Sequence, residues 1–393
     1  MLSPFFINEK QLTLTRFPIA QVNRSLQAWD AADEYLLNYI VTQQLVLDNS
    51  NVLIFNDAFG ALTTHFCTEE QLTNSSSTKN NVYCINDSFI SAQGIENNIK
   101  QNQLSNSNIT QLTCLDPLPD NVDVILYKIP KSKSLLIDQL IKIRNSVKKD
   151  TLFIAADRAK DIHSSTLKLF EKYLGTTKTS LAVKKARLVF CQLNQAQIFQ
   201  SPYPTIWPLP NKALNRDLTI NNHANVYSRE KIDIGARFFI ENLPKIESNS
   251  QVIDLGCGNG VIGLTMLARH PDAKVHFIDE SHMAITSAEL NVKTNLPELY
   301  QQCQFQLNDC LTDVESNSVD LILCNPPFHQ QTATTDHIAW QMFKDSHRVL
   351  KKGGELRIIG NRQLAYHVKL KRIFGNENFV ASNDKFVTQS AFK

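Results

Sequence analysis

The strongest constraint on the fold is a series of apolar runs that occurs twice in the chain. Each series contains short runs rich in Val, Ile and Leu, which are typical of buried strands. The runs lie at residues 52–55, 82–85 and 122–127, and again at 252–255, 275–278 and 319–324. In both series a lysine pair, Lys148-Lys149 or Lys351-Lys352, precedes a further strand. This ordered agreement favours an internal duplication over two unrelated sheets.

Helical patterns separate these strands. Apolar residues at helical spacing predict helices over 31–47, 88–103, 134–147, 233–243, 283–295 and 336–350. Strands that alternate with helices indicate a parallel, doubly wound sheet, so the fold class is α/β. Near the C-terminus, Gly353-Gly354 predicts a turn before a strand that begins at Glu355.

A chain of 393 residues is too long for one ordinary hydrophobic core, and its length suggests two or three domains. Residues 201–210 contain four prolines, which predict an extended connector outside the core. We therefore expect an N-terminal domain over 1–195, a linker over 196–225 and a C-terminal domain over 226–393.

The two copies differ where a ligand would bind. The second copy has Gly256, Gly258 and Gly260 directly after its first strand, and these glycines permit a tight turn against a small molecule. The first copy carries larger side chains there, in the run Asn56-Asp57-Ala58-Phe59-Gly60. It also has Lys128 where the second copy has Asn325. The N-terminal copy is therefore expected to be non-catalytic and to hold substrate or stabilise the fold.

Three acidic residues point to the cofactor. Asp254 precedes the glycines, where its carboxylate would repel a pyrophosphate but attract an ammonium group. Asp279 ends the second strand, where it can accept hydrogen bonds from ribose hydroxyls. Asp309 follows the third strand, where an acceptor can meet an adenine amine. Ammonium, ribose and adenine without phosphate describe S-adenosylmethionine.

The run Asn325-Pro326-Pro327-Phe328 follows the apolar run 319–324 and is the predicted catalytic segment. Ligands of open α/β sheets bind at the carboxyl ends of strands. Asn325 offers an amide acceptor, and the prolines leave backbone carbonyls free to accept. Phe328 offers a flat face for a ring. This combination suits a planar heterocycle with an exocyclic amine.

Composition limits the other possibilities. The net charge of +2 gives no overall basic field, so a nucleic-acid partner would need local patches. The eight cysteines form no CxxC pair, which favours reduced, buried thiols over a metal site or disulfides. No apolar run is long enough to span a bilayer, and the N-terminus does not resemble a signal peptide. We expect a cytoplasmic protein without metal.

The glycine loop and the Asn-Pro-Pro-Phe run resemble those of class I S-adenosylmethionine methyltransferases that act on exocyclic or amide nitrogen. The duplication with a degenerate first copy is similar to the bacterial ribosomal RNA guanine-N2 methyltransferases. The runs 328–331, 336–343 and 360–372 look more like the branch that acts on large-subunit RNA. The resemblance implies two tandem Rossmann-like methyltransferase domains and methylation of guanine N2 in 23S ribosomal RNA. It also implies naked or partly assembled RNA as the partner.

Two groups of basic residues could contact RNA. One runs from Arg348 to Arg372 and would form a phosphate track if its members shared one face. The other contains Lys184, Lys185 and Arg187 on the N-terminal half. A solvated surface on a near-neutral protein is the alternative for both.

Several alternatives remain open from sequence. The substrate could be small-subunit (16S) RNA, an adenine N6 atom or a protein glutamine, because similar pockets serve them. A non-enzymatic RNA-binding or assembly factor could also use a methyltransferase fold, and failure to bind S-adenosylmethionine would favour it. A dinucleotide-dependent dehydrogenase is disfavoured because Asp254 would face the cofactor phosphates.

Overall fold

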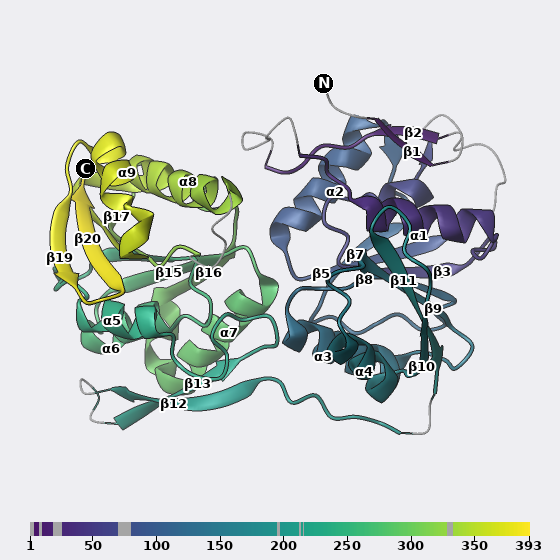
Figure 1. Cartoon of the computed structure of the whole chain (residues 1–393). Helices are drawn as coiled ribbons and strands as arrows, with labels where there is room; N and C mark the ends of the chain where they lie inside the picture. The colour runs from purple at the N-terminus through teal and green to yellow at the C-terminus, as the bar shows by residue number, and fades with distance from the viewer. Residues whose placement is uncertain are drawn as a thin grey trace. The chain divides into compact units, whose positions relative to one another are not determined.

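The computed structural model describes residues 4–7, 10–18, 26–69, 80–194, 197–211, 214, 216–327 and 333–393. The chain divides into two compact units, Met1–Pro202 and Tyr203–Lys393. Figure 1 shows that each unit has a central sheet with helices on both faces. No helix in the described ranges is both long enough and apolar enough to cross a membrane.

The N-terminal unit contains a seven-stranded sheet in the order β10-β11-β9-β8-β3-β5-β7. These strands are β3 (Asn51–Phe55), β5 (Asn81–Asn86), β7 (Ile109–Thr113), β8 (Val124–Lys128), β9 (Leu152–Arg158), β10 (Gly175–Thr179) and β11 (Ala186–Leu193). The covering helices are α1 (Ala31–Thr42), α2 (Phe89–Gln101), α3 (Lys133–Ser146) and α4 (Ser164–Tyr173).

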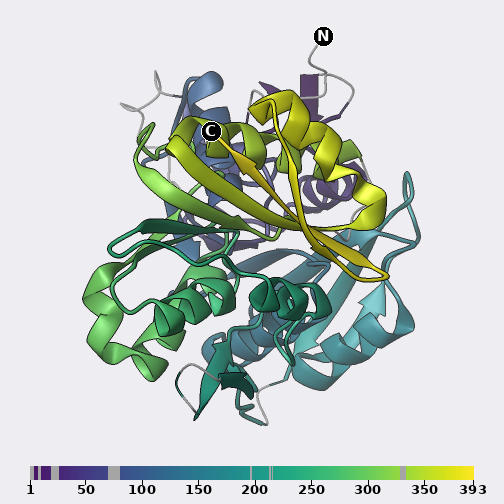
Figure 2. The same ribbon diagram turned by 90° about the vertical axis from the view of Figure 1, so that its left-hand side faces the viewer.

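The C-terminal unit contains a second seven-stranded sheet in the order β16-β15-β14-β17-β18-β20-β19. These strands are β14 (Gln251–Leu255), β15 (Lys274–Asp279), β16 (Cys303–Leu307), β17 (Val319–Cys324), β18 (Leu350–Asn361), β19 (Asn378–Ser382) and β20 (Phe386–Phe392). The helices are α5 (Ile234–Glu241), α6 (Val261–Arg269), α7 (His282–Asn295), α8 (Ala333–Val349) and α9 (Tyr366–Phe374). Figure 2 faces this unit and shows β19 and β20 in yellow beside β18.

The two sheets have the same strand order. Numbered along the chain within each unit, both read 3-2-1-4-5-7-6, and in both the seventh strand is antiparallel to its neighbours. The other pairings are parallel in both units. The predicted duplication of one doubly wound α/β unit is therefore confirmed.

A β-hairpin precedes the sheet in each unit. The N-terminal hairpin joins β1 (Pro4–Ile7) to β2 (Lys10–Thr13), and the C-terminal hairpin joins β12 (Thr205–Asn211) to β13 (Arg216–Asn222). The second hairpin occupies the stretch that was predicted to be a connector outside the core. That prediction is wrong for Trp207 and Leu209, which are buried, although the intervening Pro208 is exposed.

Equivalent asparagines, Asn98 in α2 and Asn291 in α7, attach each hairpin to its unit. Both are fully buried, and each side chain donates two hydrogen bonds and accepts one backbone N–H. The bonded partners are Thr15 and Phe59 for Asn98, and Asn221 and Asn259 for Asn291. The duplicated unit therefore includes its hairpin, which the apolar runs alone did not reveal.

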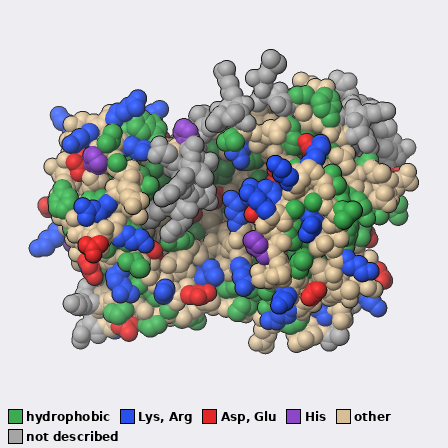
Figure 3. All heavy atoms as spheres, in the orientation of Figure 1, with side chains coloured by type: hydrophobic (Ala, Val, Ile, Leu, Met, Phe, Trp, Pro, Cys, Tyr) green, Lys and Arg blue, Asp and Glu red, His purple; other side chains and the backbone are tan. Residues whose placement is uncertain are grey.

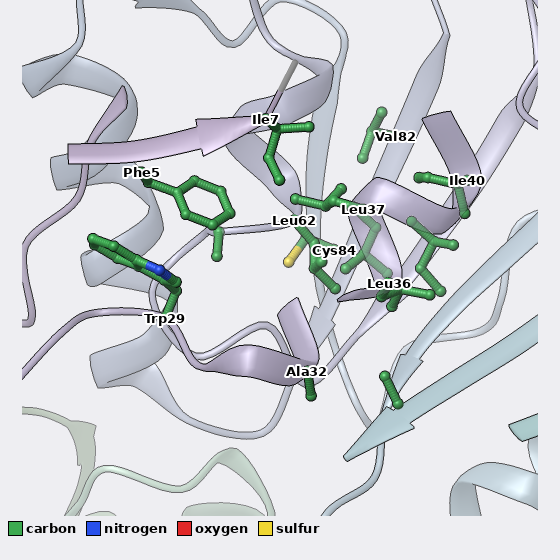
Figure 4. Packing of buried hydrophobic residues seen from close by; sticks show 14 of the residues in the cluster. Phe5, Ile7, Trp29, Ala32, Leu36, Leu37, Ile40, Leu62, Val82 and Cys84 are labelled. Atoms are coloured by element: carbon green, nitrogen blue, oxygen red, sulfur yellow. The ribbon is translucent and has the colours of Figure 1, made fainter. Parts of the chain in front are cut away.

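The core of the N-terminal unit joins this hairpin to α1 and the sheet. Figure 4 shows the rings of Phe5 and Trp29 beside each other, with Leu36, Leu37 and Val82 deeper in the same cluster. The Phe5 and Trp29 ring centroids are 5.0 Å apart. In the C-terminal unit, alternate residues of β14 contribute to separate clusters on the two faces of the sheet. This two-sided burial explains why these strands are almost wholly apolar.

One predicted turn is wrong. Gly353-Gly354 lies inside β18 rather than before it. Gly353 has a φ of +82°, and the pairing of β18 with β17 shifts register nearby. Backbone hydrogen bonds to the last residue, Lys393, hold both glycines. This long-range pairing is invisible to a local reading of two glycines.

Candidate active site

The structure brings together the described residues that the sequence predicted for the site. Asp254 lies on β14, and Asp279, Asp309 and Asn325 end or follow β15, β16 and β17. The parallel register aligns Leu255 with both Ile278 and Cys324, so these strands finish at the same edge of the sheet. That edge is the usual ligand-binding side of such a sheet.

The glycine loop turns sharply between β14 and α6. Gly256, Gly258 and Gly260 have φ values of +69°, +55° and +75°, which favour glycine. A β-carbon on Gly260 would lie 2.8 Å from the Ala288 Cβ, so this glycine is needed for close packing of the loop on α7. A β-carbon on Gly258 would meet no atom within 4 Å. Gly258 therefore borders open space where a ligand can approach the backbone.

Asp254 is buried, and only one of its carboxylate oxygens has a partner. Oδ2 accepts a 2.8 Å hydrogen bond from the Gly263 N–H. Oδ1 is enclosed and has no hydrogen-bond partner among the described residues. Burial, and secondarily the negative charge of Asp279, raise the pKa of Asp254 from 3.8 to about 7. A cation beside Oδ1 would stabilise the charged form.

This raised pKa predicts a pH dependence of stability in the protein without cofactor. The folded state holds the proton more tightly than the unfolded chain, so the protonated Asp254 stabilises the folded state. This contribution to the free energy of unfolding is complete below about pH 4 and is lost as the pH rises to about 7. The loss is about 4 kcal/mol at most. Asn at this position keeps an acceptor for Gly263 and removes the titration. Between about pH 5 and about pH 8, the melting temperature should therefore fall less in Asp254→Asn than in wild type. An equal fall in the two proteins would contradict the assignment of the raised pKa to Asp254.

Asp279 holds the glycine loop in place. Its Oδ2 accepts the Gly258 N–H at 2.9 Å, and its Oδ1 accepts the Ser281 N–H at 3.0 Å. The Gly256 N–H also donates to the Ile278 carbonyl at 2.8 Å. The carboxylate is only partly buried.

The end of β16 contributes more polar groups than the sequence indicated. Burial raises the pKa of Asp309, while a hydrogen bond with Gln341 opposes that shift. Asn308 is 1% exposed, and neither its amide oxygen nor its amide nitrogen has a partner in the described part of the chain. Gln341, on α8, also has a buried, unpartnered Oε1. Sequence reasoning missed Gln341, because no local pattern marks a polar residue on an amphipathic helix as facing a site.

Asn325 presents an unused acceptor next to the glycine loop. The residue is half-buried, and its Oδ1 is enclosed without a hydrogen-bond partner in the described ranges. Pro326 is buried and Pro327 is exposed. Neither proline has an N–H that could bond to this oxygen. Phe328, the fourth residue of the predicted segment, lies outside the described residues.

These unpartnered atoms indicate what kind of ligand fits. Buried polar atoms are nearly always hydrogen-bonded, so each of them calls for a partner. The oxygens concerned are Asp254 Oδ1, Asn308 Oδ1, Asn325 Oδ1 and Gln341 Oε1. All require a donor, such as an ammonium or an amine. The described residues include no group of three or more His, Cys, Asp or Glu that could hold a metal ion.

The equivalent loop of the N-terminal unit is filled by its own side chains. The buried Asp57 carboxylate accepts hydrogen bonds from the backbone N–H groups of Gly60, Leu62 and Thr63 and from the Thr63 hydroxyl. Asn56 adopts the left-handed conformation, with a φ of +60°. Of the three loop glycines only one has a counterpart here, Gly60, and a β-carbon on it would lie 3.3 Å from Ile95.

Lys128, at the position equivalent to Asn325, also binds to side chains of its own unit. Its Nζ lies 2.9 Å from Asp30 Oδ1 and 2.7 Å from Asp33 Oδ1. These carboxylates raise the pKa of Lys128 against the effect of burial, and burial raises the pKa of Asp33 to about 6. The N-terminal copy is therefore degenerate: a partly exposed ion cluster replaces the amide.

Comparisons with known proteins agree with this architecture. Residues 3–195 match the RLMG N-terminal domain family, and residues 217–389 match the methyltransferase small domain family. A solved structure of the T. thermophilus 16S rRNA N2 methyltransferase, in complex with AdoMet and guanosine, superposes with a TM-score of 0.73. It covers 100% of this chain and 98% of its own at 15% identity, so the likeness concerns the fold.

Other proteins are more similar to this chain in sequence than that solved structure is. The ribosomal RNA large subunit methyltransferase G of Colwellia psychrerythraea is 68% identical over 100% of both chains. The protein of the same name from Pseudoalteromonas translucida is 49% identical over 98% of this chain and 97% of its own. With this identity over the full length, the chain belongs to the family of ribosomal RNA large subunit methyltransferase G, whose cofactor is S-adenosylmethionine.

Proposed function

We propose that this protein methylates the exocyclic N2 atom of one guanine in 23S ribosomal RNA, in the cytoplasm, on naked or partly assembled large-subunit RNA. The observation that carries the proposal is the enclosed, unpartnered Oδ1 of Asn325 at the end of β17. An exocyclic amine is the donor that this acceptor lacks. The names of the relatives support large-subunit RNA, and the fold neighbour, solved with guanosine, supports a guanine base.

The described residues fit S-adenosylmethionine without a metal. Asp254 Oδ1 would accept from the ammonium group, and Asp279 would accept from the ribose hydroxyls. Asp309 would accept from the adenine amine. Gly256, Gly258 and Gly260 would let the backbone approach the ligand, as the open space at Gly258 allows. When bound, this cofactor supplies an activated methyl group on its sulfonium sulfur.

Asn325 and Pro326 would prepare the nucleophile. The lone pair of a guanine amine is conjugated with the ring, so the nitrogen is a weak nucleophile. Asn325 Oδ1 and the Pro326 carbonyl would accept its two N–H groups and orient the lone pair toward the methyl group. Phe328 would stack on the base. No general base is required before attack, because the methylated amine becomes acidic and loses its proton afterwards.

The target guanine must leave its helix to reach this edge of the sheet. An exocyclic amine inside a base pair already donates to its partner and is covered by stacking. We therefore expect an unpaired or flipped base as substrate. This requirement favours RNA in which the target is not yet locked into a finished subunit.

We further propose that the N-terminal domain, over residues 1–195, is non-catalytic and holds the RNA substrate. The catalytic domain then spans residues 226–393, and the segment 196–225 is the linker between the two domains. Asp57 and Lys128 fill the equivalents of the cofactor loop and the catalytic amide, which supports a non-catalytic role. A copy that has lost its chemistry but keeps its sheet, hairpin and exposed edge is suited to binding.

One experiment separates this function from its alternatives. Purified protein is incubated with methyl-labelled S-adenosylmethionine and either protein-free 23S RNA or protein-free 16S RNA, both transcribed without modifications. The proposal predicts label in N2-methylguanine of the 23S transcript alone. Label in 16S RNA would support the small-subunit alternative, and label in N6-methyladenine would exclude guanine as the target. RNA binding without cofactor binding would indicate a non-enzymatic factor.

A further inference from the structure

The turn between β10 and β11 has an unusual sequence for its conformation. Val183 and Ala186 form an antiparallel bridge, so Lys184 and Lys185 alone make a two-residue hairpin turn. Their φ values are +46° and +67°. Two consecutive positive φ angles define a turn that strongly favours Asn-Gly or Gly-Gly, because a β-carbon is strained there. Strain of this kind is typically retained where a side chain has a function.

The fold uses the backbone of this turn and leaves its side chains in solvent. The Lys185 carbonyl accepts the Ala159 N–H at 2.8 Å. Lys184 Nζ lies 2.9 Å from Glu34, but its side chain is 72% exposed. Lys185 forms no ion pair within the described residues and is exposed. Packing therefore does not explain why lysine occupies either position.

The turn lies at the carboxyl edge of the N-terminal sheet. Ala186, the first residue of β11, pairs with Arg158, the last residue of β9. Further basic residues follow the ends of β8 and β9 at this same edge. Together with the turn, the exposed basic residues at this edge are Lys131, Lys133, Arg158, Lys160, Lys184 and Lys185. Figure 3 shows Lys and Arg side chains gathered on the visible face of this unit, with few acidic side chains among them.

Acidic neighbours compensate only part of this charge. Arg158 pairs with Asp161 at 2.6 Å, and Lys184 pairs with Glu34. Lys128 is paired with Asp33, which is buried, and with Asp30, whose side chain is 48% exposed. Four exposed lysines at the edge have no ion pair in the ranges that the structure describes: Lys131, Lys133, Lys160 and Lys185. The edge therefore carries a local excess of positive charge on a nearly neutral protein.

The catalytic unit has a lysine at the equivalent place. Arg362 N–H donates to the Lys385 carbonyl at 3.1 Å, just as Ala159 N–H donates to that of Lys185. The strand pairings agree, because Asn361 pairs with Phe386 as Arg158 pairs with Ala186. Lys185 is thus the N-terminal counterpart of a lysine at the edge that carries Asn325. Although the degenerate copy has lost its cofactor loop, it keeps a cation at this edge.

We propose that the Lys184-Lys185 turn is a phosphate-binding element that docks the RNA backbone on the N-terminal unit. The inference rests on the proposed function for the identity of the substrate as RNA. Lysine is a compact cation that contacts phosphate without base specificity. Two neighbouring lysines on a rigid turn can neutralise two phosphates and release their counterions.

The test replaces the turn by its preferred sequence, in the double variant K184N/K185G. Because Asn-Gly relieves the backbone strain, the melting temperature stays equal or rises. Binding to protein-free 23S RNA weakens about 10-fold or more at low salt, and the slope of log K against log salt concentration decreases in magnitude by about 1.4–1.8. The KM for RNA rises, while kcat at saturating RNA and the affinity for S-adenosylmethionine stay at wild-type values.

Two controls sharpen the result. K148Q/K149Q removes an adjacent pair of exposed lysines before β9, at the opposite edge of the same sheet, and should leave the salt slope unchanged. K184R/K185R keeps the charge and should retain binding. A wild-type salt slope in K184N/K185G, or an equal loss in K148Q/K149Q, overturns the inference. Failure of the wild-type enzyme to methylate RNA would instead overturn the proposed function, so the two failures are distinguishable.

Discussion

Asn325→Ala is expected to lower kcat for RNA methylation by about 10²–10³-fold or more, because it removes an acceptor that orients the amine in the transition state. The affinity for S-adenosylmethionine should stay within about three-fold of wild type, since the cofactor contacts assigned to Asp254 and Asp279 are untouched. Single-turnover kinetics and calorimetric titration of the cofactor measure the two quantities separately.

We expect Asn325→Ala to leave the folding stability unchanged, so that a loss of activity does not reflect unfolding. Asn325 Oδ1 has no partner in the described part of the chain, so truncation breaks no hydrogen bond between this atom and the described residues. Asn325→Asp is the matched control, because it keeps an acceptor of similar size. It should retain more activity than the alanine variant. Turnover near the wild-type level in Asn325→Ala would show that the methylated group does not bind at this amide.

Gly258→Ala is expected to weaken S-adenosylmethionine binding by about 10–100-fold, equivalent to ~1–3 kcal/mol of overpacking. The added β-carbon meets no protein atom within 4 Å, so it would project into the space that we propose for the ligand. Cofactor affinity measured by calorimetry, alongside the melting temperature, checks the prediction.

Gly353→Ala provides the control for backbone strain. Gly353 also has a positive φ, +82°, and a β-carbon there also meets nothing within 4 Å. Both substitutions should therefore cost about 1–2 kcal/mol of folding stability through the left-handed conformation. Only Gly258→Ala should lose cofactor affinity. Equal cofactor affinity in the two variants would remove Gly258 from the binding site.

The sequence predicted the sheets well because their strands are buried on both faces. Runs such as 252–255 and 319–324 are apolar throughout, and they became the parallel strands β14 and β17. The positions of the proposed site residues could be predicted for a related reason: polar residues that directly follow such runs must lie at the carboxyl edge. The pairing state of their atoms, which identifies the unused acceptors, depends on distant contacts and needed the structure.

The hairpins were missed for a different physical reason. Proline usually argues against a strand, because it cannot donate to the ladder. In β12, however, Pro208 and Pro210 are exposed while Trp207 and Leu209 face the core. The hairpin has only two strands, so proline is tolerated at its edge. The alternation of apolar and proline residues was the available signal.

The basic stretch from Arg348 to Arg372 does not form the single track that was considered from sequence. Lys351 lies at the start of β18 and pairs with Asp320, at the amino edge of the sheet. Arg362 follows the end of β18, at the carboxyl edge. Arg357, between them, is paired with Glu355 and bonded to the Asn242 carbonyl. A long strand separates residues that are close in sequence, and Arg362, directly after β18, lies at the edge that carries Asn325.

Mapping of N2-methylguanine in 23S RNA tests the central claim most directly. RNA is compared from cells that lack this protein, cells supplied with the wild type and cells supplied with Asn325→Ala. The account predicts that one N2-methylguanine of 23S RNA disappears without the protein, returns with the wild type and does not return with the variant. A complete set of 23S N2-methylguanines in cells that lack the protein, or its restoration by Asn325→Ala, would contradict the account.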